Sequence, residues 1–159
     1  MNAQFSKLLQ IGIIVENVDE AVKNYEERFG MGPWRIAMMD TDEFPEMLID
    51  GKPGKLKNKC AFCNIYGMEI ELVEPQSESV YKEWLDTHGP GIHHLAFVTR
   101  DSFQEVLEQC QEMTGKAPWI HGEERNIGMD FAYVDLRKEL GLICELYNED
   151  RSQQPGHPA

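Results

Sequence analysis

The N-terminal stretch QIGIIV alternates between two kinds of position, the pattern of a β-strand with unlike faces. Ile11, Ile13 and Val15 fall on one face, whereas Gln10 falls on the other. Residues 19–30 then carry apolar side chains at helical spacing and end at a glycine, which commonly terminates a helix. The pattern therefore predicts a strand followed by an amphipathic helix.

The same succession returns later in the chain, at an offset of 84 residues (Gln10 to His94). GIHHLAFVTRDS has the alternation of a strand, and 103–115 has helical spacing up to a glycine of its own. The phrase G-x-x-P-W follows both predicted helices, at 30–34 and at 115–119. Self-similarity of this kind indicates two copies of one structural unit.

Each copy closes with a run of strands. IEL at 70–72 corresponds to CEL at 144–146, an offset of 74 residues (Glu71 to Glu145). The first copy therefore holds ten more residues than the second after its Pro-Trp. We assign this excess to a loop within 40–59, because that stretch is rich in Gly, Pro, Lys and Asp.

The organisation that follows is an α+β fold in which a βαβββ module occurs twice within one domain, 1–147. The polar residues after this domain include two prolines and are expected to form a loose tail. The predicted boundaries are module one at about 8–75, a linker at 76–91 with a short helix at 79–86, module two at about 92–147 and the tail at 148–159.

Composition narrows the function classes. Lys and Arg total 15 against 28 for Asp and Glu, a net charge of −13, and this balance repels a phosphate backbone, so no nucleic-acid partner is expected. An anionic small-molecule substrate remains open, because a bound metal ion outweighs surface charge locally. No stretch approaches the ~18 apolar residues of a membrane span, and the N-terminus lacks the pattern of a signal peptide. The four cysteines are accordingly expected to be reduced thiols of a cytoplasmic protein.

Polar residues occupy equivalent positions in the two copies. Gln10 and His94 lie on the face away from the helix in the first strand of each module, and Glu71 and Glu145 do so in a closing strand. If the two sheets curl together, these four side chains converge. Two carboxylates with neutral N and O donors suit a divalent first-row metal, with positions left open for water or substrate. Each residue alone is more typical of an ordinary strand, but the equivalent placement favours a metal site.

Several phrases resemble those of the vicinal oxygen chelate superfamily, which includes glyoxalase I, methylmalonyl-CoA epimerase and the extradiol dioxygenases. They are QIGIIVENVDEAVKNYEERFG, IELVEP, ESVYKEWLDTHGPGIHHLAF and FAYVDLRKELGLICEL, and together they cover most of 8–147. The resemblance implies two βαβββ modules forming a curved mixed sheet, usually in a homodimer. It also implies a divalent metal ion (Zn, Co, Ni, Mn or Fe) held by Gln10, Glu71, His94 and Glu145.

The phrases GPGIHHLAF and GLICEL are most similar to the epimerase-like members. The epimerase pattern usually has His at the first ligand position, so Gln10 departs from it, whereas one type of glyoxalase I uses a Gln, Glu, His, Glu set. The oxygenase members resemble a two-His-one-carboxylate iron site. Because Gln10 removes one of those two histidines, oxygenase activity is not expected.

The resemblance therefore implies an epimerase or isomerase that moves a proton next to a carbonyl, with an acyl-CoA such as methylmalonyl-CoA as its substrate. Glu46 lies where the epimerases have a catalytic glutamate, and Glu145 is the second candidate for the base. Glu46 as an ordinary surface acid remains equally open, because Asp42 and Glu43 lie beside it. Two alternatives are a glyoxalase-I-like lyase acting on a hemithioacetal and a non-catalytic small-molecule-binding protein.

Four other features are given lesser roles. Strand alternation places His93 on the face opposite His94, where it would support a ligand or pack rather than bind metal. CAFC at 60–63 has C-x-x-C spacing but no second pair, so neither a zinc nor a redox role is expected. Trp34 and Trp119 are interpreted as matched packing residues, and Tyr133 as a substrate contact.

Overall fold

The computed structural model describes residues 4–41, 47–99, 103–124 and 129–148. The strands are β1 (Phe5–Ile14), β2 (Arg35–Asp40), β3 (Leu48–Ile49), β4 (Lys52–Pro53), β5 (Lys57–Ile65), β6 (Met68–Pro75), β7 (Gly91–Thr99), β8 (Ile120–Glu124), β9 (Met129–Leu136) and β10 (Leu142–Tyr147). The helices are α1 (Val18–Phe29), α2 (Val80–His88), α3 (Phe103–Thr114) and α4 (Arg137–Leu140).

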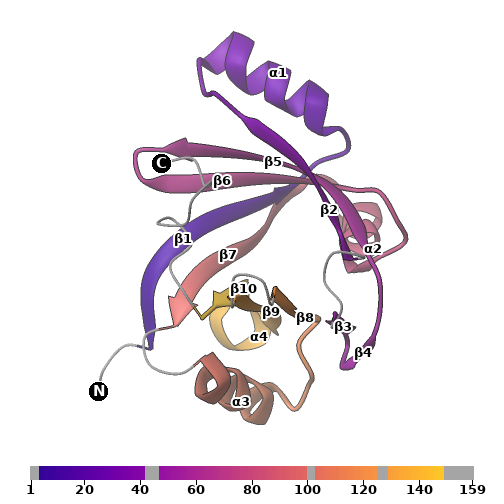
Figure 1. Ribbon diagram of the computed structural model, residues 1–159, viewed down its shortest axis with the longest axis vertical. Helices are drawn as coiled ribbons and strands as arrows, with labels where there is room; N and C mark the ends of the chain where they lie inside the picture. Colours follow the sequence, from indigo (N-terminus) through magenta and orange to yellow (C-terminus); the bar gives the residue numbers. More distant parts are fainter. Residues whose placement is uncertain (1–3, 42–46, 100–102, 125–128, 149–159) are drawn as a thin grey trace.

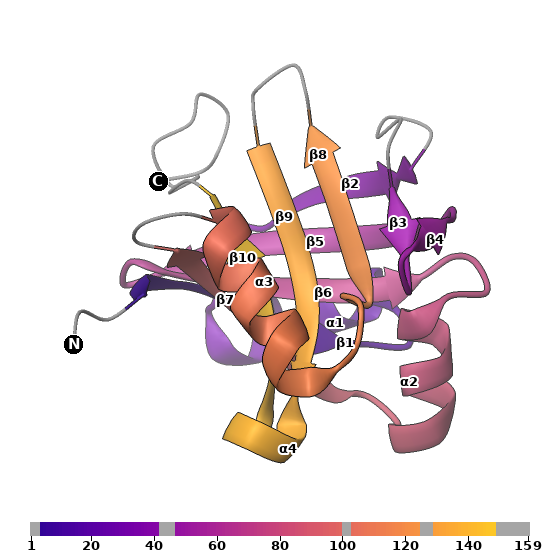
Figure 2. The same cartoon turned by 90° about the horizontal axis from the view of Figure 1, so that it is seen from below.

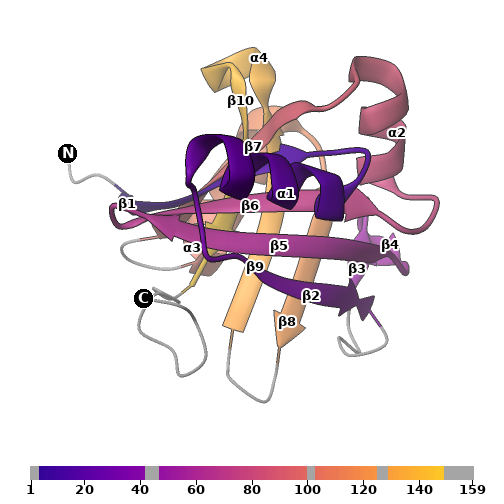
Figure 3. The ribbon, with the colours of Figure 1, turned by 90° about the horizontal axis from the view of Figure 1, so that it is seen from above.

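All the strands belong to one mixed sheet in the order β2-β5-β6-β1-β7-β10-β9-β8-β3-β4. One half follows the sequence β1, α1, β2, β5, β6 and the other follows β7, α3, β8, β9, β10, so the predicted βαβββ pattern is confirmed in both copies. The halves join where β1 pairs with β7 in antiparallel fashion. Figure 1 shows the resulting curvature, with α1 outside one half and α3 outside the other. The strands of the two halves cross at a steep angle in Figures 2 and 3.

Three apolar clusters correspond to these layers. One lies between α1 and the first half, where Val22 packs with Leu72, and another lies between α3 and the second half, where Leu107 packs with Leu146. The third fills the space between the half-sheets and includes Ile14 and Tyr133. The predicted alternation accounts for this division, since one face of each strand meets a helix and the other meets the opposite half-sheet.

Both predicted helix stops are present. Gly30 follows α1 with φ 64° and Gly115 follows α3 with φ 68°, a conformation that favours glycine. The linker helix predicted at 79–86 forms as α2, and Ser79 caps it by accepting a hydrogen bond from the backbone N–H of Lys82.

The stretch 40–59, to which the sequence assigned a loop, also contains short strands. Within it, β3 and β4 form a small hairpin, and β3 pairs with β8 through Leu48↔His121 and Ile49↔Ile120. The extra residues of the first module therefore extend the sheet of the second. Sequence-local turn residues could not reveal this, because the pairing partner lies about seventy positions away.

All four cysteines are buried free thiols. Cys60 and Cys63 lie three positions apart on β5, so their side chains point to opposite faces of the sheet, as the strand alternation predicts. Of the predicted tail, only Asn148 belongs to the described residues. In the described parts of the chain, no helix has the length and apolar character needed to cross a membrane.

Candidate metal centre

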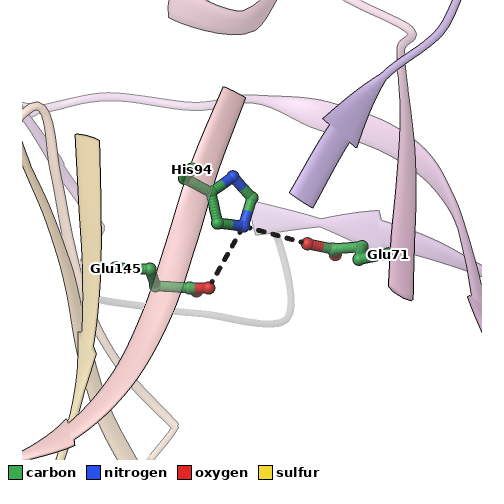
Figure 4. A group of neighbouring side chains, drawn as sticks. All are labelled: Glu71, His94 and Glu145. Atoms are coloured by element: carbon green, nitrogen blue, oxygen red, sulfur yellow. Dashed lines mark ion pairs between the residues drawn. The ribbon is translucent and has the colours of Figure 1, made fainter. Parts of the chain in front are cut away.

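The four polar residues singled out by the repeat come together at the centre of the sheet. Gln10 on β1, Glu71 on β6, His94 on β7 and Glu145 on β10 belong to four adjacent strands. Their exposed fractions are 1, 7, 1 and 2%. Figure 4 shows the carboxylates of Glu71 and Glu145 approaching one nitrogen of His94 from two sides.

Distances within the group are those of ligands that share one ion. His94 Nε2 lies 3.3 Å from Gln10 Oε1 and 3.4 Å from one oxygen of each glutamate. Two ligands about 2.0–2.1 Å from a tetrahedral first-row ion are separated by about 3.4 Å. Glu71, His94 and Glu145 each offer a ligand atom, all within 4.8 Å of one another, so these residues fit a divalent metal ion.

A glycine makes room for the histidine. Gly12 stands opposite His94 in the pairing of β1 with β7, two positions beyond Gln10 on the same face. A Cβ atom at Gly12 would lie 1.9 Å from His94 Cε1, closer than any real contact. The imidazole therefore occupies the space that a side chain at position 12 would fill.

Glu69 sets the orientation of the Gln10 amide. It is buried and stands beside Gln10 in the parallel pairing of β1 with β6. Gln10 Nε2 donates a 2.6 Å hydrogen bond to Glu69 Oε1, which leaves Gln10 Oε1 facing His94. The neutral amide oxygen of Gln10 is thereby available as a metal ligand.

One tyrosine hydroxyl contacts the second carboxylate directly, and two further tyrosines lie within the influence of its charge. Tyr147 donates a 2.5 Å hydrogen bond to Glu145 Oε1. Burial and the nearby charge of Glu145 raise the pKa values of Tyr81 and Tyr133 well above the usual range, so both stay neutral. Phenol groups that stay protonated are available as hydrogen-bond donors beside the carboxylates.

In the metal-free centre, the surrounding carboxylates favour the protonated form of His94. Burial disfavours the imidazolium of His94, but the hydrogen bonds and charges of Glu145 and Glu71 outweigh it and raise the pKa of His94 to about 9. Burial raises the pKa of Glu71, against the hydrogen bond from His94. Without a metal ion, His94 is therefore an imidazolium held by carboxylates at neutral pH.

Metal binding should consequently release about one proton per ion at pH 7, because a metal ion competes with that proton for His94 Nε2. Since the pKa of His94 is about 9, the apparent affinity should rise with pH up to about pH 9 and then level off. Titration calorimetry in two buffers of different ionisation enthalpy measures the protons released. An affinity that does not change between pH 7 and pH 9 would contradict this.

The two glutamates open onto a cavity of about 120 Å³ between the half-sheets. Its walls are mainly apolar, with Met39, Met47 and Phe131 among them, and Tyr133 also lines it. Arg35 lies along the same wall with its guanidinium 4.4 Å from the centre of the Phe62 ring. A small apolar group entering the cavity would meet the carboxylates at one end.

Two other residues that the sequence singles out are Glu46 and His93. Glu46, the first candidate for the base, lies outside the described residues, although Met47 beside it is buried and lines the cavity. The prediction that His93 lies on the face opposite His94 is wrong, because both rings are buried on the inner side with their Nδ1 atoms 3.1 Å apart. The physical reason is a β-bulge, which inserts His93 into β7 as an extra residue.

Sequence reasoning missed Glu69 and Tyr147. Alternation alone puts Glu69 on the same face as Glu71, and Tyr147 on the same face as Glu145, so that signal was present in the sequence. Their contacts depend on register and rotamer, which the pattern does not contain.

A comparison with family models matches most of the chain. Residues 9–137 match the model of the Glyoxalase/Bleomycin resistance protein/Dioxygenase superfamily. The chain belongs to this superfamily. The predicted membership, that of the vicinal oxygen chelate superfamily, and the predicted α+β fold are thereby confirmed.

Solved structures of other proteins have a similar fold. A hypothetical protein of Bacillus halodurans C-125 is 23% identical with a TM-score of 0.59, covering 94% of this chain and 98% of its own. Methylmalonyl-CoA epimerase of Mycobacterium tuberculosis is 21% identical with a TM-score of 0.61, covering 92% of this chain and 90% of its own. A methylmalonyl-CoA epimerase in complex with methylmalonyl-CoA and NH4+ is 19% identical with a TM-score of 0.55, covering 95% and 99%.

Proposed function

We propose that this superfamily member is a divalent-metal-dependent epimerase or isomerase that moves a proton on the carbon next to a carbonyl. One observation carries the proposal: a buried Gln, Glu, His, Glu set at ligand spacing whose two carboxylates open onto an apolar cavity. Gln10, Glu71, His94 and Glu145 would hold the ion. The similarity to methylmalonyl-CoA epimerases supports an acyl-CoA as the substrate.

The chemistry follows from these groups. A bound divalent ion supplies Lewis acidity that polarises a substrate carbonyl and makes its α-hydrogen more acidic. Glu145 would accept that hydrogen as a proton, and its position in the cavity lining supports this role. The hydroxyl of Tyr147 donates to Oε1 of this carboxylate and fixes its orientation. Glu46 is the other candidate base, and transfer between two carboxylates on opposite sides of the α-carbon would invert its configuration.

The cavity favours a small acyl group. A short branched acyl chain matches its mainly apolar walls, and the polar remainder of an acyl-CoA would extend past the cavity mouth. The apolar walls would exclude water from the reacting carbon, which strengthens electrostatic interactions there.

Incubating the metal-loaded protein with methylmalonyl-CoA in heavy water tests the function. We expect deuterium at the α-carbon and racemisation of a single epimer, measured by mass spectrometry and chiral analysis, because both follow from proton removal and return. The metal-free protein is the matched control. Absence of both exchange and racemisation in the loaded protein would eliminate this substrate.

Gln10 favours a second candidate, a glyoxalase-I-like lyase acting on a thiol–ketoaldehyde hemithioacetal. Its amide oxygen is turned toward His94 by Glu69, so the set offers a neutral oxygen where the epimerase pattern has a histidine. The proton-transfer chemistry is the same. Formation of a thioester from methylglyoxal with each of several thiols, followed by absorbance, tests it, and no turnover with any thiol would contradict it.

A further inference from the structure

A β-bulge places His93 beside the metal centre. In the pairing of β1 with β7, Gly12 stands opposite His94 but the next residue, Ile13, stands opposite Ile92. His93 is therefore an extra residue in β7, and a bulge redirects the side chain it inserts. Ile92 turns to solvent, 66% exposed, whereas His93 is 4% exposed.

The redirected ring contacts the candidate ligand directly. His93 Nδ1 lies 3.1 Å from His94 Nδ1, and the two rings meet edge to face. Two ring nitrogens at this distance are joined by one proton, so one nitrogen donates and the other accepts. A histidine that binds metal through Nε2 carries its proton on Nδ1. With the ion bound, His94 is therefore the donor and His93 the acceptor.

Aromatic side chains hold the acceptor in place. The rings of Tyr81 and Trp84, both from α2, lie 5.3 and 5.0 Å from the His93 ring, and Trp119 lies 6.1 Å away. The linker helix and the tryptophan of the repeated Pro-Trp phrase therefore enclose His93 from two directions. Such an enclosure fixes the ring without competing for its Nδ1 atom.

In the first module, the candidate ligand Gln10 has a hydrogen-bond partner of another kind. Leu9 is also an extra residue, since Leu8 stands opposite Phe97 and Gln10 opposite Ala96, and it packs in the apolar cluster between the half-sheets. Gln10 is oriented by Glu69 instead. Gln10 and His94 thus each have a hydrogen-bond partner outside the candidate ligand set, Glu69 and His93 respectively.

We propose that His93 is a positioning residue that accepts a hydrogen bond from His94 Nδ1–H and so directs His94 Nε2 toward the carboxylates. The inference rests on the metal centre of the proposed function. A partner on the second nitrogen of a histidine ligand fixes its tautomer and ring orientation, and losing such a partner typically weakens metal binding by about 10–100-fold.

Two substitutions separate positioning from packing. His93→Leu fills the space with apolar atoms but has no acceptor, whereas His93→Asn is smaller but keeps an oxygen near the position of Nδ1. We expect the dissociation constant for Zn²⁺, measured by competition with a chelator, to rise about 10–100-fold in His93→Leu and by less than about tenfold in His93→Asn. Cobalt-loaded His93→Leu should also show a changed visible spectrum. His121→Leu, on β8, is the control and should bind as the wild type does.

A purely structural role predicts the reverse order, with His93→Leu closer to the wild type than His93→Asn, and that order would overturn the proposal. Long-range ¹H–¹⁵N imidazole spectra of the wild-type protein provide a test that needs no variant. They should show His93 protonated on Nε2 alone in the Zn²⁺-loaded protein. A proton on His93 Nδ1 in that state would overturn the proposal. Because the spectrum reports the position of a proton and not turnover, the hydrogen bond is tested separately from exchange on methylmalonyl-CoA.

Discussion

The double variant His94→Ala, Glu145→Ala should lose the metal ion that wild-type protein, purified without chelators, is expected to carry at about one per chain. Among the four candidate ligands, His94 supplies the one nitrogen ligand and Glu145 supplies one of the two carboxylates. The loss should exceed the about 10–100-fold that removal of an outer hydrogen-bond partner costs. Metal content by mass spectrometry of the purified protein measures it.

The double variant also leaves Glu71 buried without its ion-pair partner, the His94 imidazolium. Breaking a buried ion pair lowers the free energy of unfolding by about 3–5 kcal/mol. Glu145→Gln is therefore a second variant, because it keeps the size of the side chain but removes its charge, and it should bind metal more weakly than the wild type. Glu83→Gln, at an exposed position on α2, is the matched control. Wild-type metal content in the double variant would place the ion elsewhere. A wild-type protein that takes up no metal would instead favour a non-catalytic binding protein.

Gly12→Ala is expected to disrupt the centre although position 12 supplies no ligand. The added methyl would lie 1.9 Å from His94 Cε1, so the imidazole must leave its position between the carboxylates. Overpacking of this kind typically costs about 1–3 kcal/mol of stability. We expect the free energy of unfolding to fall by that amount and the metal affinity to fall by at least about tenfold, as for loss of ligand orientation.

Urea denaturation of the metal-free protein and a metal titration measure the two effects. Gly91→Ala at the start of β7 is the control, because a Cβ there meets nothing within 4 Å. Metal affinity that is the same in Gly12→Ala as in the wild type would contradict the geometry described for His94.

The repeat in the sequence contained most of the information about the fold. Placing Gln10 on His94 and Glu71 on Glu145 predicted two βαβββ modules and the convergence of these side chains, because equivalent positions in paired modules face the shared interior. Alternation failed at His93, where a bulge inserts one residue into β7. A bulge depends on the pairing of two strands, which a single-strand pattern does not contain.

Non-local register also explains the other differences. Glu69 becomes the partner of Gln10 through parallel pairing across 59 positions. The hairpin of β3 and β4 forms against β8, which belongs to the other module. In each case the deciding contact joins segments far apart in the chain, and short-range periodicity carries no signal for it.

The division of the four candidate ligands between two modules has a consequence for the symmetry of the site. Two identical single modules that associated around a two-fold axis would place the same residue at both first-strand positions, since such an interface is self-complementary. Gln10 and His94 break that symmetry, and so do their partners, Glu69 and His93. Duplication into one continuous chain removes the symmetry constraint. In one continuous chain the two halves of the site can therefore carry different ligands, each with its own hydrogen-bond partner.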